Sequence, residues 1–429
     1  MVRRCPALFI SAPASNHGKT TVTAALARHH RRQGRRVVVF KTGPDFLDPM
    51  ILQKASGGVV RQLDLWLAGE AACRQMLYDA AAKADLILIE GVMGLFDGAP
   101  CSADVAELFG IPVLAVIDAT GLAQTIGALA TGLASYRSGV TLAGVLANVV
   151  ASDRHEEMLQ QGMPASIRYL GGIRRSATFA LPRQHLGLSP AAAVSDLDAR
   201  LDAVADAIAL LAVAALPAQV EFTSEECSPP APLLQGQRIG VACDAALSFL
   251  YPANLALLEE MGATLHYFSP LADAALPEVD SIYLPGGFPE LHLAGLQENR
   301  AMHRALRDHV EADKPLYAEC GGLLYLLESL TDKAGQQCVM AGVLPGSATM
   351  HGKLQGLGYQ TAAMPGGSLR AHTFHYSQIS MQLAPMALGQ RLFNTSAGEA
   401  IYQVGPVTAT YLHCYFPSNP IAAARLFLQ

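Results

Sequence analysis

Short apolar runs alternate with segments of helical periodicity along the first half of the chain. Polar residues or glycine bound each run, and apolar residues then recur every three or four positions. This alternation predicts a parallel sheet with helices on both faces. The expected strands span residues 7–12, 37–41, 86–90, 113–118 and 142–149, and a helical stretch over 196–215 closes this half.

The alternation stops after residue 216 and begins again at residue 238. The segment between them holds four prolines among Ser, Glu and Gln and has no period, which is typical of a linker. Strand-like runs then follow at 238–243, 281–284, 316–318 and 407–412. The sequence therefore predicts two α/β domains, residues 1–216 and 238–429, joined by a linker over 217–237.

Length and composition agree with two domains and narrow the possible partners. The 429 residues exceed the roughly 250–300 at which a single core stops growing, and 51% of them are hydrophobic. The eight cysteines form no CxxC pair and no zinc-type spacing, which favours a reducing cytoplasm. No apolar run reaches the roughly 18 residues of a membrane span, and the net charge of −6 gives no footprint for nucleic acid. We therefore expect neither a membrane nor a nucleic acid as partner, and we interpret the basic run 28–36 as a solvated helix end.

A phosphate-binding loop is indicated directly after the first expected strand. The sequence APASNHGKTT ends in Gly18, Lys19, Thr20 and Thr21, and a helical pattern follows. At such a helix start, backbone N–H groups cradle phosphates, the lysine neutralises them and a hydroxyl reaches Mg²⁺. The strict pattern has glycine where this chain has Pro13. The strand, loop and helix context nevertheless predicts a nucleotide site.

Acidic residues follow two neighbouring strands of the expected first sheet. Asp45 and Asp48 lie in a loop after the second strand, Glu90 ends the third, and Asp97 follows it. An acid that ends an apolar strand is where the Mg²⁺ ligand of a phosphate-loop enzyme belongs. Four acids exceed the needs of a nucleotide, so some are expected to face a phosphoryl acceptor, although a turn rich in Pro and Asp explains Asp45 and Asp48 equally well. Asn148, at the end of the expected strand, either reads the nucleotide base or caps the strand.

A nucleophile on a sharp turn is indicated at Cys320. The apolar strand before it ends in Ala318, and Gly322 stands two positions after it, so that both flanking positions are small. Such a strand-to-helix elbow exposes the nucleophile without a steric clash. At a helix N-terminus a cysteine pKa falls from about 8.5 toward roughly 3.5–7.5, which predicts a reactive thiolate.

The cysteine needs a base and an oxyanion site. His413 follows an expected strand and is the best candidate base, since it points to the same sheet edge. The glycine pair Gly286 and Gly287 follows another strand, and its N–H groups suit a developing oxyanion. The third member of a triad is open, because Tyr415 rather than a carboxylate stands two positions after the histidine, and Cys414 is interpreted as core.

Residues 370–377 are dense in polar aromatic side chains, among them His372 and His375. We expect this segment to lie outside the cysteine site. A strand with a buried aromatic face is the even alternative.

Taken together, the motifs resemble the cobyrinate a,c-diamide synthase family. AECGG around Cys320, LPGGFPE at 284–290, FHYS at 374–377 and the His413 strand look like its glutamine amidotransferase domain. APASNHGKTT, KTGPDFLDP at 41–49 and EGVMGLFDG look like its ATPase domain. The resemblance covers almost the whole chain, and both domains in this order with these loops are a specific combination.

The resemblance implies the fold, the reaction and the site. The fold would be a phosphate-loop domain like dethiobiotin synthetase, followed by an α/β domain like class I glutamine amidotransferases. The reaction would be amidation of the a and c carboxylates of a corrinoid polycarboxylate, with ATP and L-glutamine as co-substrates, Mg²⁺ as cofactor and a homodimer left open. The implied roles are catalysis by Cys320 and His413, oxyanion binding by Gly287 and Gly321, ATP binding by Gly18, Lys19, Thr20, Thr21 and Asn148, Mg²⁺ binding by Thr20, Asp45 and Glu90, and acceptor binding by Phe46, Leu47, Asp48 and Asp97.

Two alternatives remain open from the sequence. The acceptor is cobyrinate, hydrogenobyrinate or another tetrapyrrole acid such as nickel sirohydrochlorin, because a metal in the macrocycle needs no protein ligand. A different class is a nucleotide switch with an inactive amidotransferase domain. Glutamine-dependent ADP release distinguishes these classes.

Overall fold

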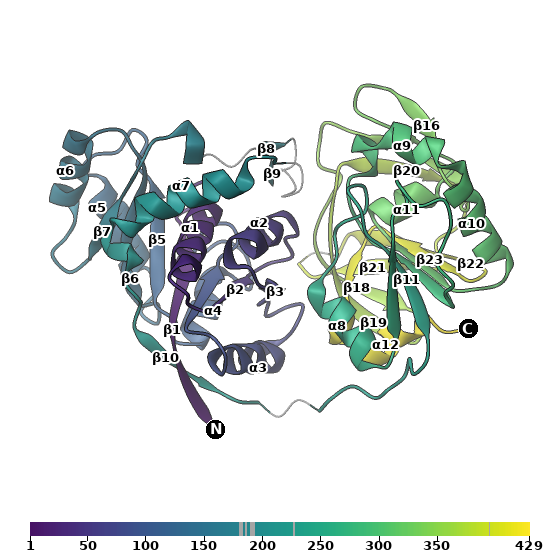
Figure 1. Ribbon diagram of the computed structural model, residues 1–429, viewed down its shortest axis with the longest axis horizontal. Coiled ribbons are helices and arrows are strands. Elements are labelled where there is room, and N and C mark those ends of the chain that lie inside the picture. Colours follow the sequence, from purple (N-terminus) through teal and green to yellow (C-terminus); the bar gives the residue numbers. More distant parts are fainter. Residues whose placement is uncertain (180–182, 185–186, 189–193, 226–227, 394) are drawn as a thin grey trace. The chain divides into compact units, whose positions relative to one another are not determined.

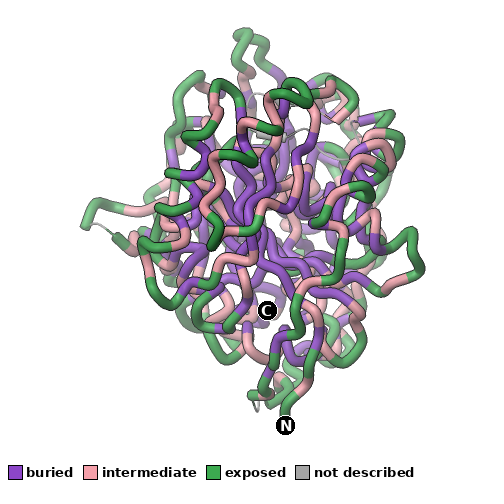
Figure 2. The backbone as a smooth tube through the Cα atoms, turned by 90° about the vertical axis from the view of Figure 1, so that its left-hand side faces the viewer, coloured by how far each residue is buried: buried purple, intermediate pink, exposed green. Residues whose placement is uncertain are grey.

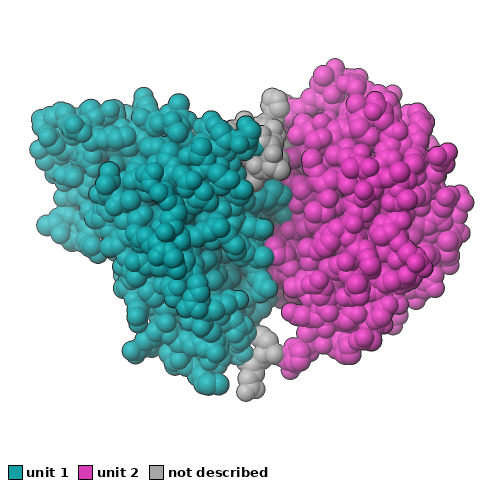
Figure 3. Space-filling model, in the orientation of Figure 1, with its two compact units in different colours: residues 1–227 teal, residues 228–429 magenta. Residues whose placement is uncertain are grey.

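The computed structural model describes residues 1–179, 183–184, 187–188, 194–225, 228–393 and 395–429. These residues form two compact units, Met1–Cys227 and Ser228–Gln429, which Figure 3 colours separately. In the part of the chain described, no helix is both long enough and apolar enough to cross a bilayer.

Unit 1 is built on a parallel sheet with strand order β3-β2-β4-β1-β5-β6-β7 (Figure 1). The expected parallel sheet is therefore confirmed, and the two strands at its ends, β3 and β7, are additional. The strands are β1 (Val2–Ser11), β2 (Val37–Lys41), β3 (Arg61–Gln62), β4 (Leu86–Glu90), β5 (Val113–Asp118), β6 (Leu142–Val150) and β7 (Tyr169–Arg174). A separate two-stranded pair joins β8 (Arg183–Gln184) to β9 (Gly187–Leu188).

Helices cover both faces of this sheet, as its two-sided apolar strands require. Successive residues of β1 show the alternation, because Phe9 packs into one core and Ile10 into the other. Figure 2 shows that the buried backbone lies in the interior and the exposed backbone at the outside. The first core is completed by α3 (Glu70–Ala81), α4 (Ser102–Leu108), α5 (Ile126–Ser135) and α6 (Asp153–Gly162), and the second by α1 (Lys19–Arg32), α2 (Leu47–Ser56) and α7 (Leu197–Ala209).

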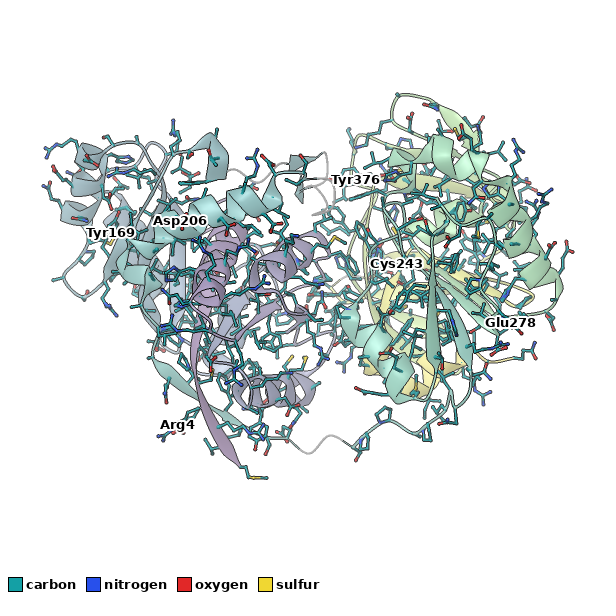
Figure 4. All side chains as sticks on the ribbon, in the orientation of Figure 1. Arg4, Tyr169, Asp206, Cys243, Glu278 and Tyr376 are labelled. Atoms are coloured by element: carbon teal, nitrogen blue, oxygen red, sulfur yellow. The ribbon has the colours of Figure 1, made fainter. Side chains whose placement is uncertain are left out.

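The basic run at the end of α1 is partly neutralised rather than simply solvated. Arg28 donates to both carboxylate oxygens of Asp202 on α7, at 2.7 and 3.0 Å. Arg32 donates to Asp206, which Figure 4 labels, at 2.7 Å. The run therefore ties α1 to α7.

The expected linker over 217–237 is wrong in its first part. Gln219–Thr223 forms strand β10, which pairs antiparallel with the first half of β1. Val220 and Phe222 alternate into the core of unit 1, while Glu221 pairs with Arg4, labelled in Figure 4. The flanking prolines concealed this two-residue period in the sequence.

Unit 2 contains a mixed sheet with strand order β12-β11-β13-β14-β23-β22-β21-β18-β19-β24. The first five strands are parallel and contain every strand expected from the sequence; the other pairings are antiparallel. The strands are β11 (Arg238–Ala242), β12 (Thr264–Phe268), β13 (Ser281–Leu284), β14 (Leu316–Glu319), β18 (Gly356–Met364), β19 (Gly367–His375), β21 (Ala387–Arg391), β22 (Ala397–Val404), β23 (Val407–Thr410) and β24 (His413–Tyr415).

A second sheet and five helices complete unit 2. The sheet has the order β16-β15-β17-β20, from β15 (Ser329–Thr331), β16 (Gln337–Val339), β17 (Gly346–Met350) and β20 (Ser377–Met381). The helices are α8 (Pro252–Glu260), α9 (Leu293–Glu298), α10 (Arg300–Glu311), α11 (Gly321–Leu326) and α12 (Pro420–Arg425). Because β13, β14 and β23 run parallel, the loops that follow them meet at one sheet edge.

Candidate functional sites

The phosphate loop joins β1 to α1 and leaves the start of that helix open. Gly18 precedes the helix with a φ of 93°, a left-handed conformation that favours glycine. A Cβ at Gly18 would lie 2.2 Å from Nδ2 of Asn148, so only glycine fits there. Lys19, Thr20 and Thr21 form the first turn of α1, whose backbone N–H groups are an anion-binding arrangement.

Lys19 is held across the loop by carbonyl oxygens. Its Nζ donates to the carbonyl of Ala14 at 3.2 Å and to that of Met93. Burial, assisted by the nearby charge of Lys41, lowers the pKa of Lys19 to about 8. A phosphate group that accepts from this ammonium would compensate its charge and restore the pKa.

Behind the loop, a buried lysine gathers three carboxylates. Nζ of Lys41, which is 2% exposed, lies 2.7 Å from Asp48, 2.8 Å from Glu90 and 4.0 Å from Asp45. Thr20 also donates to Glu90, at 2.8 Å. The sequence analysis missed Lys41, although a lysine that ends a buried apolar strand is a usable signal.

The three carboxyl groups would carry more negative charge than the single ammonium of Lys41 can balance. Burial alone would lower the pKa of Lys41, but Asp48, Glu90 and Asp45 outweigh it and raise that pKa. Burial and the neighbouring Asp48 raise the pKa of Asp45 to about 8, and burial also raises the pKa of Glu90. The group therefore carries a proton or attracts a further cation near neutral pH.

The donor set beside the loop fits Mg²⁺ held together with phosphate oxygens. Oε2 of Glu90 is buried and accepts from no donor among the described residues. Within those same residues, no cluster of three or more His, Cys, Asp and Glu side chains is arranged to hold a metal unaided. Mg²⁺ usually takes one or two carboxylates, waters and substrate phosphates, which is what Glu90 and Thr20 leave room for.

Two of the expected acceptor residues lie in a helix rather than in a loop. Leu47 begins α2 and Asp48 stands in its first turn, with Phe46 at the cap position. Oδ1 of Asp45 accepts from the backbone N–H groups of Leu47 and Asp48, at 3.0 and 3.4 Å. The expected loop is therefore wrong from residue 47 onward, because the Asp45 side chain satisfies the first amides of a helix there.

Asp97 lies in a turn after its strand, as expected, whereas Asn148 differs from its expected setting. Asp97 is exposed and accepts from the backbone N–H of Gly94 at 2.9 Å, which closes its own turn. Asn148 lies inside β6 rather than at its end, and its Nδ2 donates to the carbonyl of His17 at 3.0 Å. Its visible role is to brace the phosphate loop.

In unit 2, Cys320 occupies a strained elbow between β14 and α11. Its φ of 42° and ψ of −104° are unusual for a side chain with a Cβ. Its backbone N–H donates to the carbonyl of Thr410 at 2.8 Å, which fixes the turn. A Cβ at Gly322 would lie 2.3 Å from the carbonyl oxygen of Leu284, so the small residue expected there is required by backbone contact.

The two glycines expected at the oxyanion site lie side by side. A Cβ on Gly321 would come within 2.7 Å of the backbone nitrogen of Gly287. A Cβ on Gly287 would lie 2.0 Å from the carbonyl oxygen of Ala246. The structure thus brings these two backbone segments together next to the cysteine.

The expected lowering of the Cys320 pKa is wrong. Burial, followed by the charge of Glu290, raises the pKa of Cys320, whereas the backbone N–H of Gly321 lowers it only in part. Cys320 is 6% exposed, and α11 is a helix of only six residues. The free thiol is therefore held protonated until a base removes its proton.

His413 begins β24 and is buried as a neutral ring. Burial, then the charge of His375, lowers the pKa of His413 to about 3. A Cβ on Gly286 would lie 2.2 Å from Cε1 of His413, so that glycine makes room for the imidazole. Cys414 is fully buried in core, as expected.

The segment 370–377 lies at the cysteine site, contrary to the expectation. Its strand β19 pairs with β24 so that His372 stands opposite His413. His375 stacks on Tyr411 with ring centroids 3.7 Å apart, and its Nε2 lies 3.3 Å from Glu399. The sequence did not indicate that this segment lies near His413, because β19 and β24 are far apart in the chain.

A buried carboxylate next to Cys320 was also missed. Glu319 is 1% exposed, and its Oε2 lies 3.9 Å from Nδ1 of His413. It accepts from the hydroxyls of Tyr283 and Tyr317 at 2.9 and 2.8 Å, and from the N–H of Cys414 at 2.9 Å. A glutamate that ends an apolar strand was the available signal.

Comparisons with known proteins match a family to each of the two units. Residues 8–188 match the CobQ/CobB/MinD/ParA nucleotide binding domain, and residues 238–421 match the CobB/CobQ-like glutamine amidotransferase domain.

Full-length relatives carry a more specific name. The chain is 57% identical to the hydrogenobyrinate a,c-diamide synthase of Stutzerimonas stutzeri, over 99% of each chain. It is 57% identical to that of Pseudomonas aeruginosa, over 99% of this chain and 97% of the relative. It is 47% identical to the cobyrinate a,c-diamide synthase of Herminiimonas arsenicoxydans, over 98% of this chain and 96% of the relative. The chain therefore belongs to the hydrogenobyrinate and cobyrinate a,c-diamide synthase family of glutamine-dependent ligases.

Proposed function

We propose that the protein amidates the a and c carboxylates of hydrogenobyrinate, at the expense of ATP and glutamine. The observation that carries the proposal is the presence of two complete sites in one chain, the Lys19 loop and the Cys320 elbow. Hydrogenobyrinate is preferred over cobyrinate because the two relatives at 57% identity act on it by name, whereas the relative at 47% is named for cobyrinate.

In unit 2, Cys320 attacks the side-chain amide of glutamine. His413 takes the thiol proton and returns it to the leaving nitrogen, so that ammonia departs and a glutamyl thioester remains. The backbone N–H groups of Gly287 and Gly321 stabilise the oxyanion of the tetrahedral intermediate. Water then attacks the thioester, which releases glutamate and restores the thiol.

In unit 1, ATP phosphorylates a substrate carboxylate. The first turn of α1, with Gly18, Lys19, Thr20 and Thr21, binds the phosphates and neutralises their charge. Mg²⁺, when bound at Thr20, Glu90 and Asp45, supplies charge stabilisation to the phosphates. Ammonia then displaces phosphate from the acyl phosphate and leaves the amide.

The acceptor is proposed to bind at the start of α2, near Phe46, Leu47, Asp48 and the turn of Asp97. A polycarboxylate next to aspartates would be repelled if all of them were ionised. The ammonium of Lys41, which lies among Asp45, Asp48 and Glu90, offsets part of that repulsion. Asn148 supports the ATP loop from behind.

The test is ADP release with Mg²⁺, ATP and glutamine in the presence of hydrogenobyrinate or cobyrinate. We expect ADP and diamide in a fixed ratio, with a higher kcat/KM for hydrogenobyrinate. A higher kcat/KM for cobyrinate would overturn the substrate assignment. The absence of ADP release with either acid would overturn the reaction itself.

A further inference from the structure

We propose that Glu319 is the positioning carboxylate of the amidotransferase site and orients the ring of His413. The inference rests on the proposed glutamine hydrolysis and names a further residue for it. Among the carboxylates of the described residues, Glu319 is the one paired with His413, at 3.9 Å between Oε2 and Nδ1.

The Glu319 side chain is fixed before any substrate binds, and burial raises its pKa to about 8 in spite of three hydrogen-bond donors that lower it. Oε1 accepts from the hydroxyl of Tyr317 and from the backbone N–H of Cys414, and Oε2 accepts from the hydroxyl of Tyr283. Both tyrosines are fully buried. These three donors fix the orientation of the carboxyl group, and its Oε2 is the oxygen that lies near Nδ1 of His413.

The position of Glu319 in the chain couples the carboxylate to the nucleophile. Glu319 ends β14, and the next residue is the Cys320 elbow. The N–H of Cys414, the neighbour of His413, is one of its donors. One side chain therefore ties together the two backbone segments that carry the nucleophile and its base.

Other groups near the site are engaged elsewhere. Glu399 lies 3.3 Å from Nε2 of His375 and 3.9 Å from Arg391, so it belongs to a different imidazole. Tyr415, two positions after His413, carries no carboxylate and packs its ring against Tyr251.

The separation of 3.9 Å exceeds a hydrogen bond, but such contacts shorten when the base takes a proton. An acceptor at Nδ1 keeps the proton on that nitrogen and leaves Nε2 to receive the thiol proton of Cys320. The imidazolium formed in that step then lies next to a carboxylate that stabilises it. Without the carboxylate, the ring loses both its orientation and this stabilisation.

The experiment uses the full chain with Glu319→Gln, which keeps the size of the side chain. Glutamine hydrolysis is expected to fall about 10²- to 10⁴-fold, while synthesis with ammonium salts stays unchanged. The apparent pKa for iodoacetamide alkylation of Cys320 is expected to fall, because the charge of Glu319 raises the pKa of this thiol in the wild type. The other titratable groups around the pair, His372, His375, Glu290 and Glu399, are unchanged in the variant.

Tyr317→Phe provides a second variant that removes one hydrogen bond to Glu319 and leaves His413 intact. A loss of about tenfold in glutamine hydrolysis is expected, with the same direction of pKa change. Tyr325→Phe is the matched control, because Tyr325 is also fully buried and its hydroxyl has no partner within the described chain. If the Glu319→Gln variant does not fold, the comparison of Tyr317→Phe with Tyr325→Phe tests the role of Glu319 instead.

Three results would overturn the inference. They are unchanged glutamine hydrolysis, reduced hydrolysis with an unchanged alkylation profile, and equal loss of glutamine and ammonia use. A wild-type protein that hydrolyses no glutamine would instead overturn the proposed function, so the two failures are distinguishable.

Discussion

The two sites treat buried charge in opposite ways. In unit 1, the buried Lys41 and Glu90 meet the half-buried Asp45 and Asp48, and the excess negative charge leaves room for a cation next to the phosphate loop. In unit 2, His413 and His372 are buried as neutral rings, and the Cys320 thiol keeps its proton. The first site is prepared for a charged ligand that is already present in solution, whereas the second creates charge only when glutamine is bound.

Removal of the nucleophile gives the largest effect and separates the two sites. Cys320→Ala should lower glutamine-dependent synthesis by about 10⁴-fold or more, because no other group forms the thioester. Synthesis with ammonium salts should remain, since unit 1 is unchanged. The measurement is diamide formation with each nitrogen source, and Cys243→Ala, at an exposed cysteine, is the control. Equal loss with both sources would mean that the sites do not work separately.

Removal of the buried cation tests the charge network of unit 1. Lys41→Met leaves three carboxylates without their partner and should destabilise the protein by about 3–5 kcal/mol. The control Lys54→Met removes a half-exposed lysine that pairs with Asp198, and should cost about 0–1 kcal/mol. Urea unfolding measures both. Similar stabilities of the two variants would show that the buried network is not strongly coupled.

Removal of Lys19 should disable unit 1 and leave unit 2 active, the reverse of the Cys320 variant. Lys19→Met should lower synthesis about 10²- to 10³-fold with either nitrogen source, because the charge on the phosphates is no longer compensated. Glutamine hydrolysis measured without ATP should be unaffected. A variant that lost this hydrolysis as well would contradict the assignment of Lys19 to unit 1 chemistry alone.

Acid should weaken unit 2 through its neutral histidines. Burial lowers the pKa of both His413 and His372 to about 3, against about 6.5 in an unfolded chain. Their contribution to stability is therefore complete above about pH 6.5 and is lost as the pH falls toward 3, by about 2 kcal/mol for either ring at pH 5. Thermal unfolding between pH 7.5 and 5 checks this, and His372→Gln should reduce the slope. A melting temperature that stays constant over this range would contradict the neutral burial of these rings.

The sequence predicted what depends on local pattern. The parallel strands of both units follow from short apolar runs, and the elbow at Cys320 follows from its small neighbours. Pairings between distant segments were not predictable, and they account for the errors. His372 reaches His413 only because β19 pairs with β24, and Lys41 meets Glu90 only because β2 pairs with β4.

The predicted direction of the Cys320 pKa shift was wrong for a related reason. The sequence shows a helix start, but not how deeply the thiol is buried or that Glu290 lies near it. Likewise, the prolines that flank β10 concealed its period. The helix start at Leu47 was not predicted, because the Asp45 side chain that accepts from the Leu47 N–H was interpreted as part of a loop.

Glutamine labelled with ¹⁵N in its side-chain amide follows the nitrogen from the Cys320 site to the product. The labelled glutamine is given to the wild-type protein with Mg²⁺, ATP and hydrogenobyrinate in a buffer that contains no other source of ammonia, and the diamide is analysed by mass spectrometry. We expect the label in both new amides, together with stoichiometric glutamate. A diamide without label, or glutamate released with no labelled product, would contradict the transfer of ammonia from the Cys320 site to the Lys19 site.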